Sequence, residues 1–244
     1  MRYAILGDIH ANLDAFEAVL EDIGARGGFD ELWCLGDIVG YGPEPHACVE
    51  LLRRHKHVCI AGNHDLAAVG KIGISSFNAP AAQACQWTTQ QLTAEDVEYL
   101  ESLPLESKQG DFSLVHGSPR QPVWEYLISV DDACDNFSYL GTEFCLVGHS
   151  HVPLVFRQDR GGHCSGGKLS AETKLGCTGQ RLIVNPGGVG QPRDGDPRAS
   201  YVIYDSDCQV MYHYRVSYDV SSTQAKMRQL ELPSSLVLRL TYGY

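Results

Sequence analysis

Five short apolar runs, each followed at once by polar residues, limit the fold of this chain more than any other feature. The runs cover residues 3–6, 32–35, 58–61, 112–115 and 144–147. Stretches with helical spacing at 12–26 and 45–54 separate the first three runs, so the pattern predicts parallel strands joined by helical crossovers. The polar residues that follow the runs are Asp8, His10, Asp37, Asn63, His64, Asp65, His116, His149 and His151. Because the carboxyl ends of parallel strands share one sheet edge, we expect these side chains to converge there.

The rest of the chain divides into a helical part and a β-rich part. Residues 76–102 have helical character with a break near Thr93, where a capping-box pattern begins. After residue 148 we expect strands at 154–157, 182–184, 201–204 and 210–214, and a long loop or mobile hairpin at 158–180. One further helix is expected at 222–230. We interpret 1–244 as a single domain in which 66–105 and 215–244 form a small helical cap.

Composition excludes several classes of partner. The chain has 30 acidic and 19 basic residues, a formal charge of −11, which argues against long nucleic acids and anionic membranes as partners. No apolar segment reaches the roughly 18 residues of a membrane helix.

The first ten residues reach Asp8 and His10 too soon for a cleavable signal, so we expect a cytoplasmic protein. The nine cysteines form no CxxC pair, and we expect reduced, buried thiols.

The polar residues at the strand ends have the chemistry of a metal site. Taken singly, a strand-end Asp is typical of a helix cap, and a lone His of a structural residue. Together, seven of them offer two carboxylates, one amide and four imidazoles without a thiolate, a set that suits borderline divalent ions. Seven donors are too many for one open catalytic ion. They suit two ions about 3.5–4 Å apart that share a carboxylate and a water.

The motifs around these residues resemble a known family. DIH at 8–10, GDIVGYG at 36–42, GNHD at 62–65, VHGS at 115–118 and GHSH at 148–151 are similar, in order, to the five blocks of the calcineurin-like metallophosphoesterase superfamily. The segment NPGGVGQPRDGDPRASY at 185–201 resembles one found in its small bacterial members. The resemblance implies an α/β fold, a four-layer αββα sandwich. It also implies two divalent ions, drawn from Mn²⁺, Fe²⁺ or Fe³⁺, Ni²⁺, Co²⁺ and Zn²⁺.

The resemblance implies a role for each residue of the motifs. One metal would be held by Asp8, His10 and His151, the other by Asn63, His116 and His149, with Asp37 bridging the two. His64 would be the general acid, or a hydrogen-bond donor, for the departing oxygen. Asp65 would either orient the His64 ring or cap the next helix.

The second motif differs from that of the protein serine/threonine phosphatases of the superfamily. Their GDxxDRG block supplies an Arg to phosphate, whereas Asp37 is followed here by Ile-Val-Gly-Tyr. Arg120, Arg193 and Arg198 are candidates for that charge, with an ordinary surface position as the alternative. Asn12 either contacts the phosphoryl group or, as we favour, caps the first helix.

Other polar groups carry weaker signals. We interpret His46, His55 and His57 as structural or surface residues, because they lie outside the five motifs. His163, Cys164 and Cys177 form either an accidental metal site or, as we favour, part of a solvated loop. Residues 187–188 either cradle a phosphate with their backbone amides or, by default, form a tight turn.

The function implied is hydrolysis of a small phosphate ester, a phosphodiester first, by a metal-bridging hydroxide. A nucleotide or dinucleoside polyphosphate hydrolase and a protein phosphatase are the alternatives. The superfamily also includes the retromer subunit, so a non-enzymatic metal-binding scaffold is a further alternative. We expect a small phosphate ester as partner, no long nucleic acid and no membrane, and homo-oligomer formation stays open.

Overall fold

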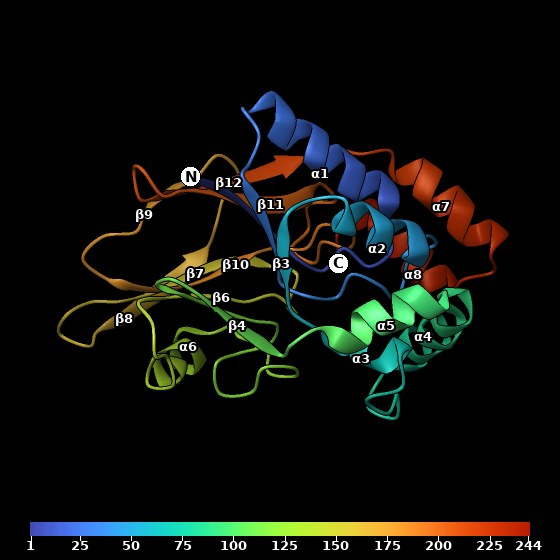
Figure 1. Cartoon of the computed structure of the whole chain (residues 1–244), viewed down its shortest axis with the longest axis horizontal. Coiled ribbons are helices and arrows are strands. Elements are labelled where there is room, and N and C mark those ends of the chain that lie inside the picture. Colours follow the sequence, from blue (N-terminus) through green and yellow to red (C-terminus); the bar gives the residue numbers. More distant parts are fainter.

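Two six-stranded sheets stack face to face and carry helices on their outer faces (Figure 1). The computed structural model describes all residues from 1 to 244. The first sheet has the order β3 (His57–Cys59), β2 (Glu31–Cys34), β1 (Arg2–Leu6), β11 (Ala199–Asp205), β12 (Val210–Val216), β9 (Lys174–Gly176). The second has the order β4 (Glu106–Gln109), β5 (Phe112–Val115), β6 (Phe144–Leu146), β10 (Arg181–Pro186), β7 (Pro153–Gln158), β8 (Cys164–Lys168). This confirms the predicted αββα sandwich.

Eight helices surround the sheets. They are α1 (Leu13–Ala25), α2 (Pro45–Arg53), α3 (Asn63–Ala68), α4 (Ala79–Gln91), α5 (Ala94–Ser102), α6 (Val130–Phe137), α7 (Val220–Gln229) and α8 (Ser234–Tyr242). Helix α1 packs on β11 and β12 of the first sheet, and α6 packs on β7, β8 and β10 of the second. None of the eight combines the length and the apolar character that a membrane span needs.

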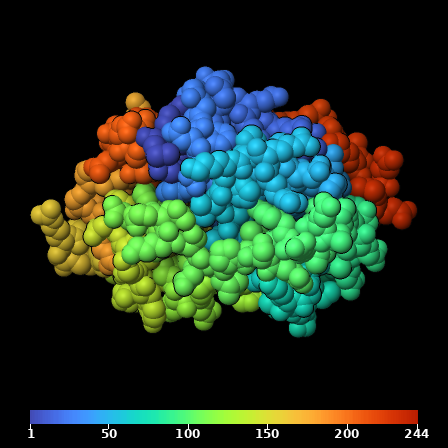
Figure 2. Space-filling view, in the orientation of Figure 1, coloured from blue at the N-terminus to red at the C-terminus, as the bar shows by residue number.

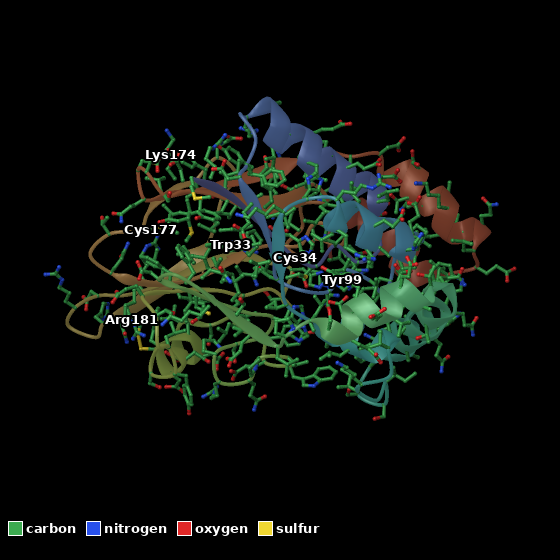
Figure 3. The ribbon with its side chains drawn as sticks, in the orientation of Figure 1. Trp33, Cys34, Tyr99, Lys174, Cys177 and Arg181 are labelled. Atoms are coloured by element: carbon green, nitrogen blue, oxygen red, sulfur yellow. A yellow bond between two sulfur atoms is a disulfide. The ribbon has the colours of Figure 1, made fainter.

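Alternation along the strands builds separate apolar layers on the two faces of the first sheet. In β2, Trp33 lies in the cluster between the sheets, whereas the next residue, Cys34, lies in the cluster under α1 and α2 (Figure 3). In β1, Ile5 contributes to the cluster between the sheets and Leu6 to the outer one, with Phe16 of α1. Successive side chains of a strand point to opposite faces, so short apolar runs can serve both layers.

The strand directions agree with the crossover prediction. β1 pairs with β2, and β2 with β3, in parallel. In the second sheet β5 and β6 are also parallel. The carboxyl ends of these five strands therefore face one side of the sandwich, and that side carries the polar residues described below.

The predicted helices are present as α1, α2, α4, α5 and α7. Thr93 caps α5 by accepting a hydrogen bond from the Asp96 amide (3.1 Å), and this cap separates α4 from α5 as expected. Helix α7 agrees with the helix expected at 222–230. Helix α8 follows it and was not predicted, nor were α6 and the edge strand β4.

The predicted helical cap comprised residues 66–105 and 215–244, which contain α4, α5, α7 and α8. Residues of α4, α7 and α8 share one apolar cluster, which includes Ala84, Met227 and Leu240 and also Tyr41 from the loop after β2. In the space-filling view the red C-terminal segment and the green helical segment lie on the same side of the molecule (Figure 2). Two segments distant in sequence therefore pack together beside that loop.

The prediction of a long loop or mobile hairpin at 158–180 was correct for the hairpin but did not include a further strand. β8 forms a hairpin with β7, and β9 crosses to pair with β12 of the other sheet. These strands contain Gly, Ser and Lys, which have low strand propensity, so their pairing is determined by the neighbouring strand and not by their own sequence.

The prediction that all cysteines are reduced was also wrong. Cys134 of α6 and Cys164 of β8 form a disulfide, which ties this helix to the edge of the second sheet. The other seven cysteines are free and, apart from Cys208, buried. Sequence spacing could not predict the pair, because 30 residues separate its members and only the fold brings them together.

Candidate metal centre and active site

The polar residues at the strand ends form two adjoining clusters of metal-ligating atoms. Asp8 and His10 follow β1, Asp37 follows β2, His116 follows β5, and His149 and His151 follow β6. The first cluster contains Asp8, His10, Asp37 and His151, and the second contains Asp37, His116 and His149. Within each cluster the potential ligand atoms lie within 4.8 Å of one another. Asp37 belongs to both, as a bridging carboxylate would.

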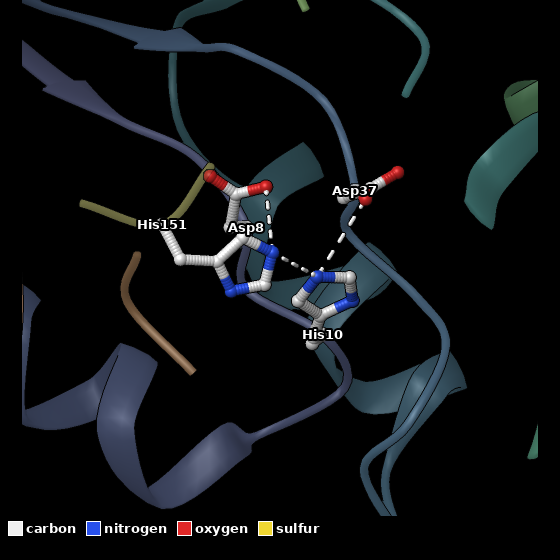
Figure 4. Close-up of side chains that lie close together, drawn as sticks. All are labelled: Asp8, His10, Asp37 and His151. Atoms are coloured by element: carbon white, nitrogen blue, oxygen red, sulfur yellow. Dashed lines mark hydrogen bonds and ion pairs between the residues drawn. The ribbon is translucent and has the colours of Figure 1, made fainter. Parts of the chain in front are cut away.

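The first cluster is compact (Figure 4). His151 Nε2 lies 3.1 Å from His10 Nε2 and 3.4 Å from Asp8 Oδ1. His10 Nε2 lies 3.5 Å from Asp37 Oδ2. Four side chains from three separate segments therefore direct nitrogen and oxygen atoms at one point.

The second cluster adjoins the other side of Asp37. His116 Nε2 lies 3.4 Å from Asp37 Oδ2 and 3.1 Å from Asn63 Oδ1. Asn63 is the first residue of α3, and the amide of the next residue, His64, donates to Asp37 Oδ1 (2.8 Å). The side-chain amide of Asn63, which the sequence predicted as a ligand, thus lies beside this cluster.

Backbone carbonyls fix three of the imidazole rings. Each ring places its Nδ1 atom within hydrogen-bond distance of a carbonyl oxygen. The pairs are His10 with Val39 (3.1 Å), His116 with Leu35 (2.8 Å) and His151 with Gln191 (2.6 Å). A proton on Nδ1 leaves the Nε2 lone pair pointing into the cluster, which is the arrangement that orients histidine ligands of metals.

Several buried atoms of the centre make no hydrogen bond. They are Asp8 Oδ2, Asp37 Oδ2, His149 Nε2 and His64 Nδ1. A buried polar atom without a partner destabilises the fold by roughly 1–3 kcal/mol. Carboxylate oxygens and imidazole nitrogens are ligands of borderline divalent ions, so the first three atoms fit a bound metal. The donor set is therefore consistent with the two ions expected.

The backbone at the centre adopts a conformation that residues other than glycine rarely take. Left-handed φ angles occur at Asp8 (53°), His10 (49°), Asp37 (53°), His149 (64°) and His151 (57°). Each such residue costs of order 1–3 kcal/mol and persists only where its surroundings hold it. Because five left-handed residues lie together at the strand ends, this part of the backbone has the strain that is typical of a functional site.

Asp65 supports the loop that carries Asp37. It accepts hydrogen bonds from the backbone amides of Asp37 (2.8 Å), Ile38 (2.9 Å), Val39 (3.1 Å) and Gly62 (3.0 Å). The Gly62 bond is the capping interaction considered for Asp65, and no hydrogen bond joins Asp65 to the His64 ring. The sequence did not suggest the bonds to residues 37–39, which make Asp65 a positioning residue.

Burial controls the charge of the histidines. It lowers the pKa values of His10 and His151 well below the usual value and that of His149 to about 3. Burial also opposes protonation of His116, but the Asp37 carboxylate outweighs it and raises that pKa to about 10. Most of these rings are thus neutral near pH 7, the form that binds metal.

A cavity of about 190 Å³ opens beside the two clusters. Asp37, His64, His149 and His151 form its polar wall, and Arg193 contributes a positive charge. The remaining wall is largely aromatic and contains Tyr41, Phe77, Trp124 and Tyr126. This aromatic wall was not predicted from the sequence. The signal in retrospect is the loop after His116, which combines prolines with Trp124 and Tyr126. In the structure these two side chains are 39% and 47% exposed.

His64 lies between the metal-ligating clusters and the aromatic wall. Its ring centroid is 4.2 Å from that of Tyr41, 4.7 Å from Phe77 and 4.9 Å from His10. Burial lowers its pKa to about 4. Near neutral pH the ring is therefore an uncharged group that can donate one hydrogen bond into the cavity.

Of the candidates for phosphate contact, the structure brings only Arg193 to the cavity. Arg120 pairs with Glu125, and Arg198 with Asp196, outside the cavity lining. Both are thus held by carboxylates on the surface, a pairing that their sequence context did not reveal.

Asn12 is a helix cap, the role that we favoured. Its Oδ1 accepts from the Ala15 amide (3.2 Å) and its Nδ2 donates to the Gly190 carbonyl (2.8 Å). The main-chain turn at Gly187, where φ is 82°, likewise agrees with the turn interpretation.

The outlying histidines lie outside the site. His46, His55 and His57 do not line the cavity. His163 is exposed, and Cys164 is occupied by its disulfide. The accidental metal site considered for 163–177 is therefore not formed.

Comparison with known proteins identifies the family. Residues 1–209 match the model of the calcineurin-like phosphoesterase superfamily domain. The chain is 39% identical to an uncharacterized protein of Methanocaldococcus jannaschii, over 98% of this chain and 97% of that protein. A crystal structure of a metallophosphoesterase from Sphaerobacter thermophilus is 48% identical, with a TM-score of 0.91 over 100% of this chain and 99% of that chain.

A shorter match concerns a protein of named activity. The symmetrical bis(5'-nucleosyl)-tetraphosphatase of Haemophilus ducreyi is 38% identical over 64 residues, which cover 25% of this chain and 24% of that protein. The family model and the two matches over nearly the whole length agree with the fold and with the Asp and His clusters. The chain belongs to the calcineurin-like phosphoesterase superfamily, whose enzymes are dimetal-dependent hydrolases of phosphate esters.

Proposed function

We propose that this protein hydrolyses small phosphodiesters with two divalent metal ions. One observation carries the proposal: two ligand clusters share Asp37 and border a cavity that also contains His64 and Arg193. A metal-binding scaffold would need the clusters but not the cavity with its additional polar groups. The net charge of −11 favours a small substrate over a long polyanion.

Each metal has a proposed set of ligands. Asp8, His10 and His151 would hold one, Asn63, His116 and His149 the other, and Asp37 both. The ligand types suit Mn²⁺, Fe²⁺, Co²⁺, Ni²⁺ or Zn²⁺. When bound, such ions neutralise phosphoryl oxygens and acidify water, which supplies the nucleophile near neutral pH.

His64 and Arg193 would act on the substrate directly. A neutral His64 favours hydrogen-bond donation to the departing oxygen over transfer of a proton from imidazolium, since its pKa is about 4. Arg193 lines the cavity and pairs with no Asp or Glu side chain, so its guanidinium can bind phosphoryl oxygens. Asp65 would act through the Asp37 loop and not on substrate.

The aromatic wall supports a diester over a monoester. Phe77 and Trp124 meet edge to face with centroids 5.9 Å apart, and Tyr126 stacks on His149 at 4.0 Å. These rings provide apolar surface for a second organic group on the phosphorus. A phosphodiester carries such a group and a monoester does not. The partial match to a tetraphosphatase makes dinucleoside polyphosphates a second substrate class to test.

The test is hydrolysis by protein loaded separately with Mn²⁺, Co²⁺, Ni²⁺ or Zn²⁺. We expect bis(p-nitrophenyl) phosphate to be cleaved with a higher kcat/KM than p-nitrophenyl phosphate. A higher kcat/KM for the monoester would contradict the diester assignment. Absence of hydrolysis of either ester and of diadenosine tetraphosphate, with two metals bound per chain, would instead support the scaffold.

A further inference from the structure

Two arginines beside the cavity share one neutral acceptor. Arg193 Nη2 and Arg239 Nη1 both donate to Gln191 Oε1, at 2.9 and 2.8 Å. Gln191 is buried, at 2% exposure, and its backbone carbonyl accepts from His151 of the first cluster. The buried amide therefore positions two guanidinium groups side by side, next to the metal-ligating residues.

No Asp or Glu side chain compensates these two charges. Neither Arg193 nor Arg239 has a side-chain carboxylate within 4.0 Å, and Arg193 Nε is buried without any partner. Burial and the charge of Arg193 both lower the pKa of Arg239. Two adjacent partly buried cations repel each other, and an anion that accepts from both would relieve the repulsion.

The pair spans two neighbouring cavities. Arg193 lines the cavity beside the metal-ligating clusters. Arg239, from α8, lines a second cavity of about 230 Å³ together with Pro80, Ser235 and Tyr244. Asn78, the N-cap of α4, lines both cavities, so they adjoin. A substrate held at the clusters would therefore reach Arg239 by passing Asn78.

We propose that Arg193 and Arg239 form a second anion subsite, which binds a further phosphate group of the substrate. The preferred substrates are then compounds in which another phosphate is linked to the one that water attacks, such as nucleoside or dinucleoside polyphosphates, so that a phosphoanhydride bond breaks and a phosphate group leaves. Guanidinium groups match phosphate oxygens in geometry and charge. This inference rests on the proposed function and goes beyond it by naming the part of the substrate that the C-terminal helix recognises.

Binding to the metal-free protein tests the subsite independently of catalysis. Calorimetry with tripolyphosphate should show affinity at least about tenfold weaker for Arg239→Gln than for the unmodified protein, the loss of one charge-assisted hydrogen-bonding group. Arg160→Gln removes an exposed arginine outside both cavities and should bind as the unmodified protein does. Equal affinity of all three proteins would overturn the subsite.

Arg239 also has a structural contact, because its Nε donates to the Tyr244 backbone oxygen (2.6 Å). The melting temperature of each variant therefore has to be measured. Arg239→Lys retains a charge on the same helix and should restore part of the tripolyphosphate affinity. If the loss of tripolyphosphate affinity in Arg239→Lys and Arg239→Gln follows the fall in their melting temperatures, Arg239 has a structural role only. That result would refute the subsite.

Catalysis by the Mn²⁺-loaded enzyme separates the two proposals. Arg239→Gln should lower kcat/KM for diadenosine tetraphosphate by about tenfold more than for bis(p-nitrophenyl) phosphate, because only the former carries a further phosphate. An equal loss for both substrates would contradict the subsite while leaving the phosphodiesterase proposal intact. If no ester is cleaved, the proposed function fails, and the calorimetric comparison still decides whether the subsite exists.

Discussion

His10 Nε2 and His151 Nε2 lie 3.1 Å apart, although 141 residues separate them in sequence. Each ring places its Nδ1 against a backbone carbonyl, so both Nε2 atoms present lone pairs to each other. Burial lowers both pKa values, which disfavours a proton between the rings. Two facing lone pairs repel unless a cation lies near them, and the adjacent Asp8 carboxylate completes a ligand set for one.

Replacing His64 should separate metal binding from turnover. We expect His64→Asn to retain both metals and to lower kcat for bis(p-nitrophenyl) phosphate by about 10²–10³, the range for loss of one hydrogen-bond donor to a developing negative charge. The loss should be larger for esters of alkyl alcohols, which leave less readily. Metal analysis and steady-state kinetics measure the two effects. The exposed His163, changed to Asn, is the matched control, and full activity of His64→Asn would refute its role.

Removing Asp65 should destabilise the protein. Asp65→Ala leaves four backbone amides without their acceptor, and each buried unsatisfied group costs roughly 1–3 kcal/mol. We expect the free energy of unfolding in urea, without metal, to fall by about 3 kcal/mol or more. Asp159 accepts from two backbone amides in an exposed turn, so Asp159→Ala should cost less than about 1 kcal/mol. A similar small loss at Asp65 would contradict its positioning role.

His213 should make stability depend on pH. It is buried between the Ser170 carbonyl and the Ser200 hydroxyl, both 2.8 Å away, and burial lowers its pKa. The hydrogen bond to the Ser170 carbonyl opposes this shift, Arg215 lowers the pKa further, and Asp194 and Glu172 raise it. The unfolded chain, with a histidine pKa of about 6.5, therefore binds more protons at acid pH, so stability present above about pH 6.5 is lost as the pH falls.

Urea unfolding at pH 7.5, 6.5 and 5.5 measures this effect. His213→Gln should lose less stability between pH 7.5 and 5.5 than the unmodified protein, because its side chain does not titrate. The slope contributed by a single histidine is at most about 1.4 kcal/mol per pH unit. His163→Gln, at an exposed position, should follow the unmodified protein. Parallel curves for His213→Gln and the unmodified protein would show that His213 does not contribute.

Trp124 should affect substrate affinity more than chemistry. We expect Trp124→Ala to raise KM for bis(p-nitrophenyl) phosphate by about three- to tenfold, as for the loss of one aromatic contact, with a smaller change in kcat. Tyr139, which is 58% exposed and outside the cavity lining, gives the control Tyr139→Ala. An unchanged KM in Trp124→Ala would mean that the aromatic wall does not bind the substituent.

The sequence predicted the polar edge of the sandwich because local patterns determine it. Asp8, Asp37 and His116 each follow a short apolar strand, and strand direction then places them together. The helix break at Thr93 is also local, since one side chain caps the next helix. Such features need only the periodicity of the chain and the topology of parallel strands.

Features that depend on distant contacts were not predictable in this way. β9 forms in a segment of low strand propensity because β12 is available to pair with it. The Cys134–Cys164 disulfide needs the packing of α6 on β8. Arg120 and Arg193 could not be ranked from sequence, because the difference between them is the presence of Glu125 beside the one and of the cavity beside the other.

The metal content of the protein and of Asp37→Ala tests the central claim most directly. Asp37 is the one residue common to both clusters, so we expect two divalent ions per chain in the unmodified protein, fewer than one in the variant, and loss of phosphodiester hydrolysis. Asp111→Asn, at an exposed position, should retain both ions. Two ions retained in Asp37→Ala with undiminished hydrolysis would contradict the shared dimetal centre.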